Sequence, residues 1–100
     1  MKFKDGVKVF GVRPELVLAM MTVNTVYVDE GYEFVITSVV DGKHSRTSLH
    51  YSGGAFDCRI WGIPEHNRQG FVKLLKLALT DEFDVVLEKD HIHIEFQPKG

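Results

Sequence analysis

Residues 91–96, with the sequence HIHIEF, alternate polar and apolar side chains, and this alternation constrains the fold more than any other feature of the chain. Side chains at every second position of a β-strand lie on the same face. The two isoleucines and the phenylalanine therefore form the natural core face. The two histidines and the glutamate lie on the opposite, accessible face. The pattern predicts the last strand of a sheet with one buried side.

Other segments supply the rest of the sheet and the helices that pack against it. Pro14 is placed for the first turn of a helix that Gly31 would end. Pro64 and Glu65 open a second helix with apolar side chains on one side. Only Lys89 and Asp90 separate the last two strands, which indicates an antiparallel hairpin. The further strands expected are residues 32–40, 55–61 and 83–88, with residues 7–12 as a short strand or an extended lead-in. These elements predict an α+β domain: a small, mostly antiparallel sheet with two helices packed on it.

Length and composition predict one globular domain over residues 1–100. The hydrophobic fraction of 44% and the charged fraction of 26% are ordinary for a folded protein. A net charge of −2 leaves no basic surface that would indicate a nucleic-acid partner. No apolar run approaches the roughly 18 residues of a membrane span, and the N-terminus lacks the apolar region of a signal peptide. We therefore expect a protein that is cytoplasmic on synthesis and has no membrane partner.

Four residues near the predicted site are expected to be structural. Cys58 is the only cysteine, which excludes an internal disulfide, and its apolar surroundings predict a buried, inert thiol. Tyr51, Phe56 and Trp61 are predicted to be packing residues rather than platforms for a substrate.

Two separated segments combine imidazole and carboxylate groups: residues 48–57 (SLHYSGGAFD) and residues 90–93 (DHIH). Two His and one Asp can bind a divalent metal and leave one coordination position open, as in catalytic zinc sites. A further acid beside the last ligand can act as a general base. A His-x-His pair is a weak indication of metal binding when it occurs alone. The two segments together predict a hydrolase with a metal centre.

The pattern Ser-x-His-x-x-Gly-x-Ala-x-Asp, followed by an acid three residues before a His, resembles the D-alanyl-D-alanine carboxypeptidase family of zinc metallopeptidases. That family includes L-alanyl-D-glutamate endopeptidases among phage endolysins and shares its fold with the signalling domain of hedgehog proteins. The resemblance covers about residues 12–96. It implies a Zn²⁺ cofactor, the stem peptide of peptidoglycan as the partner, and a protein that could be phage-encoded and released to the cell wall.

The resemblance also implies a role for each residue that matches the motif. His50, Asp57 and His93 become the zinc ligands. Asp90 falls where the family places its catalytic Asp or Glu, and His91 becomes a partner either of a metal ligand or of the transition state. Glu88 is an alternative base whose spacing fits the family less well.

On the substrate side, the resemblance places Ser48 near the carboxylate of the substrate. The chain departs from the family where an Arg usually polarises the substrate carbonyl, because residues 38–43 contain none. Arg46 or Lys43 is the predicted substitute.

Two other functions remain open at this point. Two His and one carboxylate also describe non-haem Fe(II) oxygenase sites, although those sites usually belong to larger β-barrels. A non-catalytic module is the other alternative, in which zinc stabilises the fold or the site binds a wall peptide without cutting it. The missing Arg supports this non-catalytic module as the alternative to the peptidase.

Overall fold

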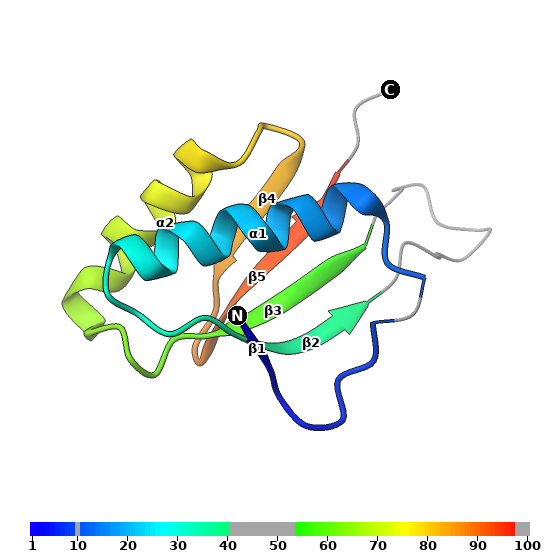
Figure 1. The fold of residues 1–100 in the computed structure, drawn as a ribbon. Coiled ribbons are helices and arrows are strands. Elements are labelled where there is room, and N and C mark those ends of the chain that lie inside the picture. The colour runs from blue at the N-terminus through cyan, green and yellow to red at the C-terminus, as the bar shows by residue number, and fades with distance from the viewer. Residues whose placement is uncertain (10, 41–53, 98–100) are drawn as a thin grey trace.

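Two helices lie on one face of a five-stranded sheet in the computed structural model of the chain, which describes residues 1–9, 11–40 and 54–97 (Figure 1). The helices are α1 (Pro14–Asp29) and α2 (Arg68–Ala78), and a 3₁₀ turn (Glu65–Asn67) leads into α2. The strands are β1 (Lys2–Phe3), β2 (Val35–Val40), β3 (Ala55–Arg59), β4 (Phe83–Leu87) and β5 (His91–Phe96). The predicted α+β class and the two helices are confirmed.

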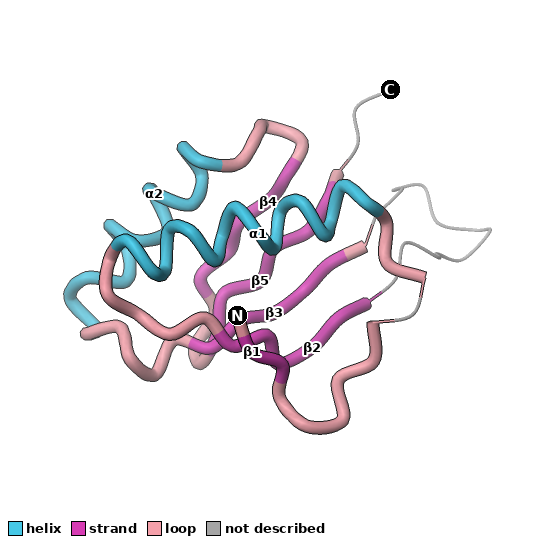
Figure 2. Tube along the Cα trace, in the orientation of Figure 1, coloured by secondary structure: helices cyan, strands magenta, loops and turns pink. Residues whose placement is uncertain are grey.

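The sheet is mixed, and three of its four strand pairings are antiparallel, in line with the mostly antiparallel sheet that was expected. Its order is β1-β2-β3-β5-β4, and β1 runs parallel to β2 while every other pair is antiparallel. The parallel pair follows from the connection, because α1 lies between β1 and β2 in the chain and carries it back across the sheet (Figure 2). One edge strand is Lys2–Phe3. Residues 7–9 and 11–12, expected as a short strand or an extended lead-in, form no strand.

Helix α1 begins and ends where its sequence predicts. Pro14 occupies the first turn, and Gly31, just beyond the last turn, adopts the left-handed conformation with φ of 82° that glycine tolerates best. The buried side chains recur at helical spacing and cover the sheet. They are Leu16, Ala19, Met20, Val23 and Tyr27.

The alternation in β5 places its apolar side chains in the core, as predicted. Ile92 and Ile94 are fully buried and Phe96 nearly so. Burying each side chain of this size stabilises the fold by about 1.5–3 kcal/mol. Cys58 in β3 belongs to the same core, and burial raises the pKa of its thiol to about 12, so the predicted inert thiol is confirmed.

Both helices lie on the same face of the sheet, and no helix of residues 1–9, 11–40 and 54–97 covers the other face (Figures 1 and 2). The half-buried polar side chains of β3 and β5 alternate with the buried ones, so they lie on this second face, which we call the open face; they are Asp57, Arg59, His91, His93 and Glu95. Within the described ranges, neither helix has the length and apolar character to cross a membrane.

Candidate functional site

Strands β3 and β5 are antiparallel neighbours, and their register assembles the polar residues of the open face. Asp57 lies opposite His93, and Arg59 lies opposite His91. Opposed residues in a sheet have Cβ atoms about 4.5–5.5 Å apart, within reach of a direct contact. The pairing therefore joins two of the predicted zinc ligands that are 36 residues apart in the sequence.

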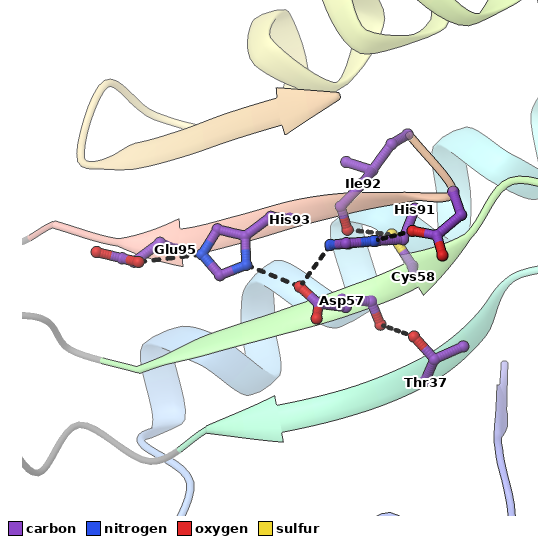
Figure 3. Close-up of polar contacts among 8 residues, drawn as sticks. Thr37, Asp57, Cys58, His91, Ile92, His93 and Glu95 are labelled. Atoms are coloured by element: carbon purple, nitrogen blue, oxygen red, sulfur yellow. Dashed lines mark hydrogen bonds and ion pairs between the residues drawn. The ribbon is translucent and has the colours of Figure 1, made fainter. Parts of the chain in front are cut away.

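Asp57 is the centre of this group (Figure 3). Its Oδ1 atom accepts a hydrogen bond from Nδ1 of His93 at 2.7 Å and lies 3.7 Å from Nε2 of His91. The side chains of Asp57, His91 and His93 are 26%, 31% and 30% exposed. The three groups are thus partly shielded from water but remain accessible to a ligand.

His93 is held from both sides. Its Nε2 atom lies 3.0 Å from Oε1 of Glu95, whose other oxygen accepts a hydrogen bond from the side chain of Gln97. Carboxylates at both ring nitrogens favour a doubly protonated imidazole. Burial alone would lower the pKa of His93, but the hydrogen bonds and charges of Glu95 and Asp57 outweigh it and raise the pKa above its usual value.

This arrangement predicts how the metal-free protein responds to pH. Because the pKa of His93 is higher in the folded state than the unfolded value of about 6.5, its contribution to stability is complete below about pH 6.5 and is lost as the pH rises through the folded pKa. NMR titration of the His93 ring in chelator-treated protein measures that pKa in the folded state, and the same titration in denaturant gives the unfolded value. A folded-state pKa of His93 at or below the unfolded value would contradict the prediction.

Asp90 and His91 form a second pair at the end of the β4–β5 hairpin. Nδ1 of His91 lies 2.7 Å from Oδ1 of Asp90, which leaves Nε2 of His91 on the side of Asp57. The hydrogen bond from His91 lowers the pKa of Asp90, whose side chain is 82% exposed. The ionised carboxylate thus fixes the orientation of the His91 ring.

Four of the seven predicted site residues therefore lie together: Asp57, Asp90, His91 and His93. Ser48, His50 and Arg46 fall in residues 41–53, outside the described part of the chain, so the third zinc ligand and the substrate contacts stay predictions. Across residues 1–9, 11–40 and 54–97, no three His, Cys, Asp or Glu side chains are grouped to hold a metal ion. Of the three predicted zinc ligands, the structure therefore describes two, Asp57 and His93.

A pocket of about 330 Å³ adjoins this pair and contains residues that the sequence did not reveal as functional. It is lined by Lys4, Thr37, Asp57, Arg59, Trp61, Asp90 and His91. Of the three aromatic residues expected to pack, Phe56 is buried, whereas Trp61 is 74% exposed and lines this pocket. Tyr51 lies outside the described residues.

A simple signal could have found Arg59 and Glu95. Each lies two residues after a predicted ligand in a strand, and residues at this spacing share a face. Lys4 had no such signal, because it reaches the site through the pairing of β1 with β2.

Comparisons with models of known protein families, with curated proteins and with solved structures found no match. The functional argument for this chain therefore depends on its own residues and their geometry.

Proposed function

We propose that this domain is a zinc-dependent peptidase that hydrolyses an amide bond in the peptidoglycan stem peptide, of the D-Ala-D-Ala carboxypeptidase or the L-Ala-D-Glu endopeptidase type. The observation that carries the proposal is the 2.7 Å contact between Asp57 Oδ1 and His93 Nδ1, with the Asp90–His91 pair beside it. The motif that includes His50 supplies the third ligand and the substrate class.

The donor atoms suit zinc. Ligand atoms about 2.0–2.2 Å from a tetrahedral zinc lie about 3.3 Å from each other, so the Asp57–His93 contact of 2.7 Å needs only a small opening. Glu95 holds Nε2 of His93, as carboxylate partners of metal-bound histidines commonly do, so Nδ1 would bind the metal after giving up its proton. Zinc at such a site lowers the pKa of water to about 7 and polarises a substrate carbonyl.

The Asp90–His91 pair supplies the proton chemistry in this proposal. Asp90 is ionised at neutral pH, since its pKa is lowered by the hydrogen bond from His91. It accepts a proton from the attacking water and returns it to the leaving amine. His91, whose Nε2 lies near Asp57, stabilises the negative charge that develops on the carbonyl oxygen.

Zinc analysis combined with a digest of purified muropeptides tests the proposal. We expect one zinc per chain that a chelator removes, and mass spectrometry should show new amines that disappear with the metal and return with it. Binding of wall peptide without new amines would support the non-catalytic module and overturn the peptidase. Iron in place of zinc, with turnover of 2-oxoglutarate, would support an oxygenase.

A further inference from the structure

We propose that Arg59 and Lys4 form a binding site for the C-terminal carboxylate of a peptide, beside Asp57 and His91. The binding site stands on its own geometry, whereas its consequence for the reaction depends on the peptidase function proposed above. That consequence is specific: a carboxylate held here makes the domain a carboxypeptidase rather than an endopeptidase.

Arg59 is placed and oriented for a ligand. It follows Asp57 by two residues in β3, so both side chains lie on the open face. Its guanidinium carbon lies 3.9 Å from the centroid of the Trp61 ring, an arrangement that fixes the plane of the charged group. The exposed indole therefore acts as a support for Arg59 on the open face.

Within residues 1–9, 11–40 and 54–97, no carboxylate forms an ion pair with Arg59. Glu33 pairs with Nζ of Lys2 at 2.9 Å, and this pair lowers the pKa of Glu33 more than the charge of Arg59 does. The Nε atom of Arg59 is buried and has no hydrogen-bond partner among these residues, and such donors are rare in native proteins. The positive charge of Arg59 is therefore not neutralised by a carboxylate of the described chain.

Lys4 adds a second cation to the same pocket. The backbone N–H of Lys4 donates to the carbonyl of Ile36 at 2.8 Å, which fixes the main chain beside β2. Its ammonium group forms no ion pair with any side chain in the described part of the chain. Thr37 also lines the pocket, and its hydroxyl donates to the backbone carbonyl of Asp57 at 3.3 Å. The two cations are therefore the groups in this pocket that can hold an anionic oxygen pair.

The geometry favours a carboxylate close to the bond to be cut. The fork of an arginine matches the two oxygens of a carboxylate. Asp57 and Arg59 are two positions apart in an extended strand, about 6.6 Å along its axis, and both line the same pocket. The pocket volume of about 330 Å³ is at the lower limit for small-molecule sites, which suits a terminal residue.

A peptide with its terminal carboxylate on Arg59 places the preceding amide beside Asp57 and His91. The oxygen of water then bonds to the carbonyl carbon, the carbon–nitrogen bond breaks, and a proton passes to the leaving nitrogen. The products are a peptide shortened by one residue and a free amino acid.

Fluorescence of Trp61, the only tryptophan in the chain, measures binding without any need for turnover. The probes are N-acetyl-D-alanyl-D-alanine and its C-terminal amide. We expect the acid to bind at least 10-fold more tightly than the amide, and Arg59→Gln to remove that difference. Lys4→Gln, at an exposed residue whose loss leaves the core intact, should weaken binding of the acid severalfold. Lys73→Gln, on the exposed side of α2, is the charge-matched control and should change nothing.

Equal binding of acid and amide by the parent protein would overturn the site, as would equal binding of the acid by the parent and Lys4→Gln. Displacement of the acid by inorganic phosphate at the same concentration would also overturn it, because the pocket would then be a general anion site. Kinetics on the same probes separate this inference from the proposed function. Selective binding of the acid without turnover keeps the carboxylate site and refutes the peptidase. Equal cleavage of acid and amide keeps the peptidase and refutes the carboxylate site.

Discussion

Replacing His93 with Ala is expected to abolish zinc binding and, with it, peptidase activity. The substitution removes the Nδ1 atom that lies 2.7 Å from Asp57 and leaves the carboxylates of Asp57 and Glu95 without the cation between them. Removing a residue that hydrogen-bonds to a metal ligand typically lowers metal affinity by about 10- to 100-fold. Removing the ligand itself should therefore lower it by more than about 100-fold. Zinc titration against a competing chelator measures the effect.

Two further variants make this result interpretable. His66→Ala changes an exposed histidine of the 3₁₀ turn on the way to α2, and it should bind zinc as the parent does. Glu95→Gln keeps the ligand but weakens its support, and its affinity should lie between those of the parent and His93→Ala. Circular dichroism confirms that each variant is folded. Unchanged zinc affinity in folded His93→Ala would refute the Asp57–His93 metal pair.

Asp90→Asn is expected to reduce turnover by about 100- to 10,000-fold, the usual contribution of a general base. The amide of Asn has the shape of the carboxylate but cannot accept the proton. Residue 90 is not one of the proposed zinc ligands, so the Asp57–His93 pair stays unchanged. Zinc affinity should therefore stay within a factor of a few of the parent value. Measuring kcat on zinc-loaded protein separates the loss of the base from the loss of the metal.

The matched controls for this variant are acidic residues elsewhere. Asp29→Asn, at the exposed end of α1, should retain full turnover. Glu88→Gln tests the alternative base directly, since Glu88 precedes the β4–β5 turn and has an exposed side chain. If Glu88→Gln loses turnover while Asp90→Asn keeps it, the assignment of the base is wrong.

The sequence predicted the fold best where a local pattern reports a local environment. Alternation over residues 91–96 identified both faces of β5, and the short Lys89–Asp90 connection identified its hairpin with β4. Pro14 and Gly31 marked the ends of α1 because each has a conformational preference that suits a helix terminus. These signals need no knowledge of the rest of the chain.

The parallel edge strand could not be predicted in this way. Strand β1 contains only Lys2 and Phe3, which is too short to show any periodicity, and its place is decided by long-range pairing with β2. Lys4 follows directly after this strand, so its position in the pocket could not be predicted from the sequence either.

The candidate site shows the same division between local and long-range information. The motif residues Asp57, His91 and His93 were identified by type and spacing, and the β3–β5 register brings them together. Trp61 was misjudged because a large aromatic residue next to a strand usually packs in the core, and the sequence does not show that the chain turns away after Ile60. The role of the indole depends on Arg59, which contacts it only in the folded protein.

The two-sided character of β5 has a consequence for how this domain can evolve. Its even-numbered positions from 92 to 96 anchor the interior, and its odd-numbered positions from 91 to 95 carry the polar groups. Substitutions on the second set can alter reactivity while the first set keeps the scaffold intact. New chemistry can therefore arise on this strand by single mutations, without a compensating change inside the protein.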